Sequence, residues 1–527
     1  MPDRSSASSS HRRPAPWFMV LPAVALLLPL TTAAGILPAG FIRGADLSYL
    51  QQIEDAGGVF RDAGRPQDAL EIFRRHGFNY VRLRLWHTAP GAYNGLGKTL
   101  QMALRIKQKK MKFLLDFHYS GTWADPGHQA PPPEWAGLPY SVLRDSMYQY
   151  TFSVIAALKA QQTPPDMVQL GNEISCGLLW DAGNVCGSFN TPAQWDQLAG
   201  LLSDARRAVH DALSPSDSAL IMIHTDRSAD PGGAIWFFDS LTARGVAFDI
   251  IGLSYYPWWH TRDLGVLTRT LDTLAGRYHK DILIAETAYP WTLASQDTVF
   301  NQVGSTGQII DQFPATVEGQ EGFLDTLMHI VADIPENLGV GICYWAPDHI
   351  VAPAFGSDWE NLALFDFGGN ALASFAAFEP QMEIGYPPGW NLVSVPYVPG
   401  SAEAGSVFPQ PGALLFAYSG SYEPTDTVTT GQAYWIYLAD SGTVLFHGRY
   451  VAGDTITVNR NWNLIGTGDL PVAAAGIIPV PPVVITSGVF GLTSGSAGYS
   501  VADTLEPGRG YWLRVSAAGK IVLNSPR

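Results

Sequence analysis

Two glutamates stand out in this chain because each closes an apolar run typical of a buried parallel strand. Glu173 ends the segment 166–173 (DMVQLGNE), and Glu286 ends the segment 281–286 (DILIAE). Burying a lone carboxylate is unfavourable unless it is paired or used by a site. Two carboxylates at strand ends of one barrel would project into one cleft, as a proton donor and a nucleophile or base for glycosidic bond hydrolysis. The alternative is that either glutamate only caps a helix or pairs with a structural arginine.

Polar and aromatic side chains gather at the ends of the predicted strands, whereas the strand bodies are apolar. In a barrel of parallel strands, the active site forms at the carboxyl ends. Aromatic rings there suit the faces of sugar rings, although some will belong to the core, and Asp116 could simply pair with Arg82 or Arg84. Besides the two glutamates, the candidates for binding or orienting a substrate are Asp46, Arg84, Trp86, His118, Trp123, Asn172, Tyr256, Trp291 and Trp345.

Strand-like and helix-like runs alternate from Gly40 to about Phe378, which predicts a parallel sheet wrapped by helices. Eight β/α units in about 340 residues indicate an α/β fold of the (β/α)8 TIM-barrel type. An open doubly wound sheet is disfavoured, since no glycine-rich phosphate loop follows the first strand. The predicted strands are 41–48, 78–86, 112–120, 167–173, 219–227, 248–257, 281–290 and 339–348.

The composition changes near residue 385, where helical periodicity ends and Gly, Pro, Ser, Thr and Val dominate. GWNLVSVP (389–396) returns as NWNLIGTG (461–468), and GQAYWIYL (431–438) returns as GRGYWLRV (508–515). This repeat predicts a smaller all-β module of two similar halves. Its tryptophans could form a sugar-binding platform, but their strand spacing favours a place in the core. The predicted domains are a signal peptide (1–34), the catalytic barrel (35–384) and the accessory module (385–527).

Charge and the N-terminal segment indicate the class of partner and the compartment. A net charge of −15 argues against nucleic acid, while 12% aromatic and 15% charged residues suit a neutral polar ligand. A basic start, an apolar stretch and small residues at Thr32 and Ala34 predict a cleaved signal peptide, hence a secreted, extracellular protein; an uncleaved membrane anchor is the alternative. In that compartment Cys176 and Cys186, at the ends of one short loop, are candidates for a disulfide.

Seven segments together resemble glycoside hydrolase family 53, the arabinogalactan endo-β-1,4-galactanases, over residues 40 to about 378. The resemblance implies a retaining enzyme that cleaves galactan side chains of pectin, with Glu173 as acid/base and Glu286 as nucleophile. It also implies that Asn172 bonds the substrate 2-hydroxyl, that Arg84 and Tyr256 orient Glu286, and that His118 lines the cleavage subsite. The segments are GADLS (44–48), VRLRLW (81–86), LDFHYSGTWADPG (115–127), LGNEI (170–174), IGLSYYPWW (251–259), AETAYPW (285–291) and LFDFGGNAL (364–372).

The chain departs from the family at Ala346, where a glutamate is usual, and in the loop after the seventh strand. Bacterial members often bind calcium there, and the candidates here are Asp297, Asn301 and Asp358, fewer oxygen ligands than calcium takes. The chemistry requires no cofactor, and binding of a structural calcium ion is left as an open alternative. The alternatives are a clan relative that cuts mannan or xylan, and a non-catalytic carbohydrate-binding surface protein, with the C-terminal module contacting polysaccharide or the cell surface.

Overall fold

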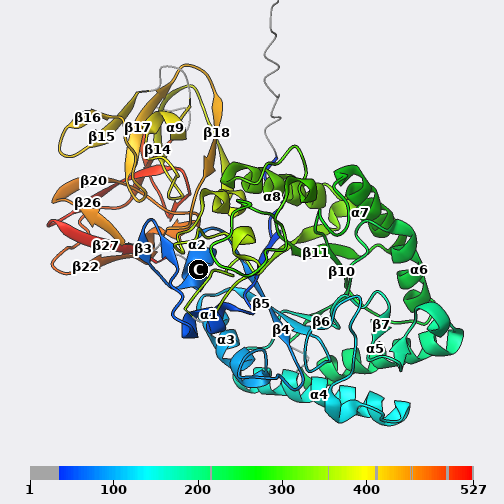
Figure 1. Cartoon of the computed structure of the whole chain (residues 1–527). Coiled ribbons are helices and arrows are strands. Elements are labelled where there is room, and N and C mark those ends of the chain that lie inside the picture. Colours follow the sequence, from blue (N-terminus) through cyan, green and yellow to red (C-terminus); the bar gives the residue numbers. More distant parts are fainter. Residues whose placement is uncertain are drawn as a thin grey trace, which may run out of the picture. The chain divides into compact units, whose positions relative to one another are not determined.

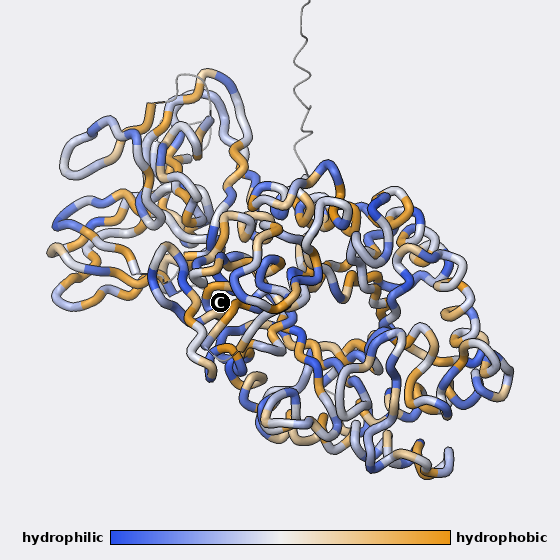
Figure 2. The backbone as a smooth tube through the Cα atoms, viewed as in Figure 1, coloured by the Kyte–Doolittle hydropathy of each residue, from blue (hydrophilic) through white to orange (hydrophobic). Residues whose placement is uncertain are grey.

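The computed structural model describes residues 35–524 apart from 214–216, 354, 410–413, 452, 454 and 494–497. The predicted signal peptide, residues 1–34, lies outside the described residues. Ile36 to Arg527 form one compact unit. Hydrophobic stretches along this part of the chain are short and interrupted by hydrophilic ones (Figure 2), and none of its described helices is long and apolar enough to cross a membrane.

Eight parallel strands close into a barrel, which confirms the predicted TIM-barrel fold (Figure 1). Each strand lies within its predicted segment, and most end two or more residues earlier than predicted, because the polar end residues already belong to turns. The order around the barrel is β1-β12-β11-β10-β9-β6-β5-β4. The strands are β1 (Ile42–Asp46), β4 (Tyr80–Leu85), β5 (Lys112–Phe117), β6 (Met167–Leu170), β9 (Leu220–Thr225), β10 (Ile250–Ser254), β11 (Asp281–Thr287) and β12 (Gly339–Trp345).

Helices cover the outside of the barrel (Figure 1). Thr191 is the N-cap of α5: its hydroxyl accepts from the Gln194 amide (3.3 Å), and Pro192 is the first helical residue. The helices are α1 (Leu50–Asp55), α2 (Ala69–Arg75), α3 (Leu96–Gln108), α4 (Tyr140–Ala160), α5 (Pro192–Ala212), α6 (Pro231–Thr242), α7 (Leu264–Tyr278) and α8 (Val317–Ala332). Two small hairpins lie in barrel loops: β2 (Arg61–Asp62) with β3 (Arg65–Pro66), and β7 (Gly177–Leu178) with β8 (Gly183–Asn184).

The barrel interior changes from apolar to polar along the strands. Side chains alternate between faces, so residues two apart share the interior. Toward the amino ends an apolar cluster fills it, including Tyr80, Leu114 and Met167. Two residues further along these strands come Arg82, Asp116 and Gln169, all buried. The period of the strands therefore stacks a charged layer on an apolar one, directly below the carboxyl ends.

The C-terminal region forms antiparallel sheets in two similar halves, as the repeat predicts. A four-stranded sheet of order β14-β17-β15-β16 in the first half corresponds to β20-β26-β23-β24 in the second. The first half holds β13 (Gln381–Tyr386), β14 (Gly389–Ser394), α9 (Ala404–Val407), β15 (Leu415–Tyr418), β16 (Tyr422–Thr425), β17 (Ala433–Leu438) and β18 (Gly442–His447). The second holds β19 (Thr455–Val458), β20 (Asn461–Gly466), β21 (Val472–Ala473), β22 (Ile477–Val480), β23 (Phe490–Leu492), β24 (Tyr499–Val501), β25 (Thr504–Leu505), β26 (Gly510–Val515) and β27 (Gly519–Leu523).

The prediction that the repeated tryptophans are core residues is wrong for two of them. Trp390 is 52% exposed and Trp462 is 38% exposed, whereas Trp512 is 8% exposed. The reason is the face of the sheet that each occupies. On β14, Val393 faces the core of its half, while Trp390 alternates onto the opposite face. Strand spacing alone does not say which face is buried.

Candidate active site

Arg82, at the centre of the charged layer, holds the acidic side chains of the site together. Its Nη1 atom donates to Asp46 Oδ2 (2.7 Å), and its Nη2 atom lies 2.9 Å from Asp116 Oδ2 and 2.8 Å from Glu286 Oε1. Nη2 also donates to Asn172 Oδ1 (2.8 Å). Because a guanidinium presents several donors in a fixed plane, one buried cation orients all four partners.

Glu286 is held at both carboxylate oxygens. While Oε1 faces Arg82, Oε2 accepts a hydrogen bond from the Tyr256 hydroxyl (3.1 Å). Its position follows an irregularity in the pairing of β10 with β11, where Leu253 is opposite Ile284 and Ser254 is opposite Glu286. Burial raises the pKa of Glu286 to about 7, against the opposing effect of Arg82. The charge of Arg82 lowers this pKa, but the desolvation caused by burial outweighs it.

Glu173 follows β6 in a tight turn that depends on a glycine. Gly171 has φ +87°, and a Cβ there would lie 2.6 Å from Ile174 Cγ2. Glu173 itself adopts φ +47°, a conformation uncommon for residues other than glycine. Burial, and then the charge of Glu286, raise the pKa of Glu173 well above its usual value. The two carboxyls therefore differ: Glu173 keeps its proton more strongly than Glu286 does.

Asn172 is fixed by four neighbours. Its Oδ1 accepts from Arg82 and from Gln169 Nε2 (2.9 Å) and lies 3.0 Å from His224 Nδ1, while its Nδ2 donates to the Ala124 carbonyl (2.8 Å). An amide nitrogen carries two N–H groups, so one remains for a ligand in the cleft. Burial lowers the pKa of His224 well below its usual value, and its ring is therefore neutral.

His118 lies between Asp116 and the loop that follows β5. Its Nδ1 atom accepts a hydrogen bond from the Ala124 amide (3.1 Å), which places the proton on Nε2, and Nε2 lies 3.0 Å from Asp116 Oδ2. The ring is thus held in one tautomer at the wall of the cleft. Asp116, which sequence reasoning left open as a structural residue, binds both Arg82 and His118.

Arg84 does not contact Glu286, and its predicted role in orienting that carboxylate belongs to Arg82. The Arg84 guanidinium carbon lies 4.2 Å from the Tyr49 ring centroid and 4.3 Å from the Trp123 ring centroid. Both arginines alternate onto the interior face of β4, two residues apart. Arg84 lies two residues nearer the carboxyl end of the strand, where aromatic rings surround it, whereas Arg82 lies among the buried carboxylates.

The side chains around the two glutamates line a cleft of about 590 Å³ at the carboxyl ends of the strands. Among the predicted residues, it brings together Arg84, His118, Trp123, Asn172, Glu173, Tyr256, Glu286 and Trp345. Asp46 is buried behind Arg82 and orients it. Trp86 is buried behind the Trp123 ring, with 5.5 Å between centroids. Neither residue lines the cleft.

Trp291, another predicted substrate residue, does not line the cleft. Its backbone amide donates to the Asn361 carbonyl (3.0 Å), its indole donates to the Glu360 carbonyl (3.2 Å), and its ring packs on Phe367 (4.8 Å). It supports the loop after β12. Ala346, where the family usually has a glutamate, is buried and does not line the cleft either.

Sequence reasoning missed several lining residues in loops. Tyr49 precedes α1, and Trp359 lies in the loop after β12, with its ring 4.6 Å from that of Trp345. These loops carry no periodic pattern, and an aromatic residue in a loop is by itself a weak signal. Asp358, considered above as a calcium candidate, also lines the cleft, together with Asp226, Trp259, His260 and Gln302.

The predicted disulfide between Cys176 and Cys186 is confirmed, with 5.2 Å between the two Cα atoms. It closes the loop that carries the β7–β8 hairpin, directly after Glu173. Within the same loop, the Trp180 indole donates to the Cys176 carbonyl (3.1 Å). Cys343 is a buried free thiol, and burial raises its pKa to about 12.

The three calcium candidates do not form a ligand set. Asp297 Oδ1 accepts from the Val299 amide (2.8 Å), and Oδ2 accepts from the Ser357 amide (2.9 Å). The Asn301 amide faces the Glu360 carboxylate, and Asp358 Oδ2 accepts from Gln302 Nε2 (3.0 Å). In the described part of the chain, no three His, Cys, Asp or Glu side chains gather as metal ligands. Both carboxylate oxygens of Asp297, one of Asp358 and the Asn301 amide thus take part in hydrogen bonds within these loops.

Known proteins are similar to this chain over the barrel. The sequence model of glycosyl hydrolase family 53 matches residues 42–378. An arabinogalactan endo-β-1,4-galactanase from Cellvibrio japonicus is 36% identical over 372 residues, which cover 68% of this chain and 96% of that protein. An endo-β-1,4-galactanase from Bacillus subtilis is 30% identical over 383 residues, 64% of this chain and 85% of that protein.

Solved structures show the same similarity. The Ignisphaera aggregans GH53 catalytic domain superposes with a TM-score of 0.61 at 36% identity, covering 66% of this chain and 97% of that domain. A structure described as one of two fungal β-1,4-galactanases superposes with a TM-score of 0.56 at 30% identity, covering 64% of this chain and 98% of that one. In each case the matched part of this chain leaves about a third of it uncovered.

Proposed function

The chain belongs to glycosyl hydrolase family 53, and from that premise we propose that it is a retaining endo-β-1,4-galactanase acting on galactan or arabinogalactan. The observation that carries the proposal is the pairing of two unlike carboxyls in one cleft. Glu286 is bound by Arg82 and Tyr256, and Glu173 lies nearby with a pKa raised well above its usual value. The galactanases named above, which match through the barrel, support the choice of substrate.

In the first step of this mechanism, ionised Glu286 attacks the anomeric carbon as protonated Glu173 gives its proton to the glycosidic oxygen. The bond to the leaving sugar breaks, and a glycosyl ester forms on Glu286. In the second step, Glu173 takes a proton from water. The water oxygen bonds to the anomeric carbon, and the Glu286 carboxylate leaves. Two inversions give net retention, for which we expect about 5–5.5 Å between the two carboxyls.

The surrounding residues prepare these steps. Arg82 and Tyr256 each bind one oxygen of Glu286, so the carboxylate has little freedom to rotate before it attacks. The remaining N–H of Asn172 is available to the 2-hydroxyl of the sugar being cleaved. Trp123 and Trp345, whose ring centroids are 6.1 Å apart, offer surfaces for neighbouring sugar rings. His118, held in one tautomer, lines the cleft at the subsite of the sugar being cleaved.

The decisive test is product analysis by mass after digestion of pectic galactan, mannan and xylan. Short β-1,4-linked galactose oligomers from galactan alone would support the proposal. Products from mannan or xylan instead would identify a clan relative, and no products from any of them would identify a binding protein. Release of single sugars from the chain end would contradict the endo mode.

The roles of the two glutamates are tested by chemical rescue. Glu286→Ala should be inert toward all substrates, because both steps need the nucleophile. Glu173→Ala should retain more activity on aryl glycosides with acidic phenols, whose leaving groups need no proton. Azide should rescue this second variant to a β-azide product. An α-azide product from Glu173→Ala, together with a β-azide product from Glu286→Ala, would show that the two roles are exchanged.

We propose further that the enzyme is secreted and that its chemistry needs no metal ion, since each proton and bond change above is assigned to a side chain. The signal peptide predicted over residues 1–34 supports export. A secreted product that begins at Gly35 by mass, and unchanged kcat after treatment with a chelator, are the expected results. A product that keeps residues 1–34, or activity restored by calcium after chelation, would contradict the two statements.

A further inference from the structure

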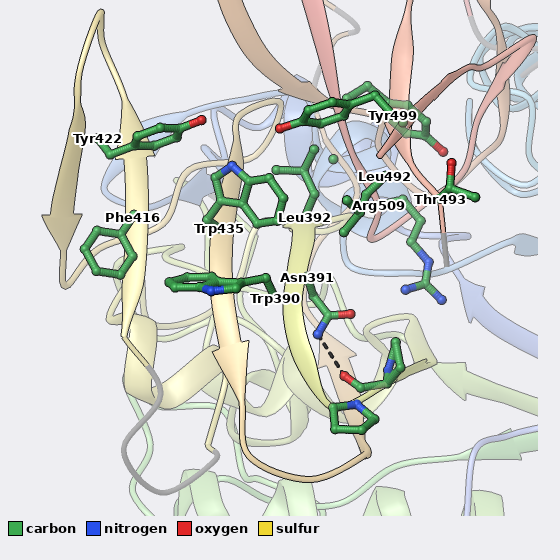
Figure 3. Close-up of a pocket in the computed structure, with 15 residues that line it drawn as sticks. Trp390, Asn391, Leu392, Phe416, Tyr422, Trp435, Leu492, Thr493, Tyr499 and Arg509 are labelled. Carbon is green, nitrogen blue, oxygen red and sulfur yellow. Dashed lines mark hydrogen bonds between the residues drawn. The ribbon is translucent and has the colours of Figure 1, made fainter. Parts of the chain in front are cut away.

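A second cleft, of about 1260 Å³, lies in the C-terminal region between the two halves of the repeat (Figure 3). The first half contributes Trp390, Phe416 and Trp435, and the second contributes Leu492, Tyr499 and Tyr511. In Figure 3 the Tyr422 and Tyr499 side chains approach from opposite halves, with their hydroxyls pointing toward one another above the Trp435 ring. The catalytic barrel contributes none of the described residues that line this cleft.

The two halves are related by the repeat, yet only one side of their contact is open. Pairing of the strands makes Trp435 equivalent to Trp512, because they lie opposite Leu392 and Leu464. In the same way Tyr418 is equivalent to Leu492, because they lie opposite Tyr422 and Tyr499. The Tyr418 ring packs edge-on against Trp512, at 4.8 Å between centroids.

On the other side, leucine replaces that tyrosine. Leu492 supplies no ring to cover Trp435, which stays half-buried and lines the cleft, whereas Trp512 is 8% exposed. One difference between the halves, tyrosine in the first and leucine in the second, thus accompanies a closed contact on one side and a cleft on the other. A repeat kept only for packing has no need of this asymmetry.

The cleft also holds an amide oxygen that has no donor among the described residues. The Asn463 side chain accepts from the Asn459 amide (2.7 Å) and donates to the Asn459 and Asn461 carbonyls. Its equivalent, Asn391, makes the same two donations, to the Pro387 and Gly389 carbonyls. Proline has no N–H, so Asn391 Oδ1 accepts no hydrogen bond from the described residues. Asn391 is 4% exposed and lines the cleft.

The lining indicates a neutral ligand. Arg509 is the one charged residue among the described lining residues, and its guanidinium is engaged: it donates to the Gly385 carbonyl (2.9 Å) and lies 4.7 Å from the Tyr386 ring. Exposed rings, tyrosine hydroxyls and an amide oxygen without a donor among the described residues suit a molecule with apolar ring faces and hydroxyl donors. A proline-rich peptide also stacks on such rings, but it has few donors for Asn391.

We propose that this cleft binds a chain of neutral β-linked sugars, and specifically galactan, the polymer that the barrel is proposed to cut. The choice of galactan rests on the proposed function, whereas the site itself rests on the open side of the repeat. Trp390, 52% exposed, and Trp435, whose ring centroid is 6.1 Å from it at a steep angle, supply the stacking surfaces. Asn391 accepts a hydrogen bond from a sugar hydroxyl.

The test is native gel electrophoresis of the full chain in gels that contain soluble galactan, with Glu286→Gln in every sample to prevent hydrolysis. Trp390→Ala should weaken retention on the order of tenfold, as for an aromatic residue central to an interface. Leu492→Tyr removes no ring from the cleft. The new tyrosine should cover Trp435, as Tyr418 covers Trp512 on the closed side, and should therefore weaken retention. Trp462→Ala is the matched control, the same substitution at the equivalent position, and should leave retention unchanged.

Two outcomes would overturn the proposal. Equal retention of the parent, Trp390→Ala and Leu492→Tyr would show that the cleft binds no galactan, and equal weakening by Trp462→Ala would remove the distinction between the two sides. Parallel gels with mannan, xylan or a β-glucan identify the occupant, and retention in one of them without retention in galactan would contradict the choice of polymer. Galactan hydrolysis is measured separately, with Trp390→Ala in a chain that keeps Glu286. Absence of products in that assay would contradict the catalytic proposal, and it is independent of the result of the gels.

Discussion

The two clefts of this protein differ in the type of residue that surrounds them. The barrel cleft lies on a buried layer of charges, in which Arg82 joins Asp46, Asp116 and Glu286. The cleft of the C-terminal repeat has one engaged arginine and is otherwise lined by rings and small polar groups. Bond cleavage needs groups that change charge, and buried charges need fixed partners. Holding a neutral chain needs neither, so exposed rings suffice.

The largest effect is expected on kcat, which should fall far more when Arg82 is replaced than when Arg84 is replaced. Arg82→Lys replaces a five-donor fork by a single ammonium group, leaving several buried carboxylates with fewer partners. We expect kcat to fall by roughly 10³-fold or more, with native near-ultraviolet dichroism as the check on folding. Arg84→Lys, which loses only ring contacts, should cost about tenfold or less. Equal losses would return Arg84 to the role that sequence reasoning assigned to it.

The pH dependence of kcat/KM should belong to the barrel cleft alone. Because the pKa of Glu286 is raised to about 7 and attack needs its ionised form, activity should fall about tenfold per unit as pH drops below that value. The alkaline limb reflects loss of the Glu173 proton, at a pKa well above its usual value. Tyr256→Phe removes a donor to ionised Glu286, so the acidic limb should move to higher pH. Trp390→Ala should leave both limbs in place, and a shift there would contradict the independence of the clefts.

The disulfide beside Glu173 should stabilise the barrel by a moderate amount. Replacing both Cys176 and Cys186 by serine should lower the free energy of unfolding by roughly 2–3 kcal/mol on the chain-entropy model, measured by chemical denaturation. Retention in galactan gels, a property of the other cleft, should be unchanged in the folded variant. Thiol counting on the denatured, unreduced parent should find Cys343 alone, and three thiols per chain would contradict the bond.

The smallest effect is expected from removal of the C-terminal region. A chain that ends at Pro380, just before β13, should keep its kcat/KM on soluble galactan and, with Glu286→Gln, should show weaker retention in galactan gels than the full chain. It also loses the ion pair between Arg449 Nη1 and Asp62 Oδ1 (2.9 Å), so a modest decrease in Tm should accompany the deletion. A folded but inactive truncated chain would show that the two clefts depend on one another. The boundary predicted after residue 384 stays a prediction.

Local sequence was enough to predict the barrel and its two glutamates. Each strand is an apolar run with a polar end, a pattern that depends on residues within a single segment. Glu173 and Glu286 were found in this way, as was the Cys176–Cys186 bond, whose partners lie ten residues apart. The repeat likewise revealed two similar halves, because equivalent strands keep equivalent motifs.

Tertiary structure alone decided which of several similar residues does what. Arg82 and Arg84 have the same type, strand and face, and only the neighbouring strands of the closed barrel bring the Glu286 carboxylate to one of them. Tyr49 and Trp359 reach the cleft from loops without periodicity. Trp435 and Trp512 occupy equivalent motifs, but Trp435 lines a cleft and Trp512 is covered, because the partner half presents leucine at one contact and tyrosine at the other. Period and composition act within a segment, whereas burial and pairing are set between segments.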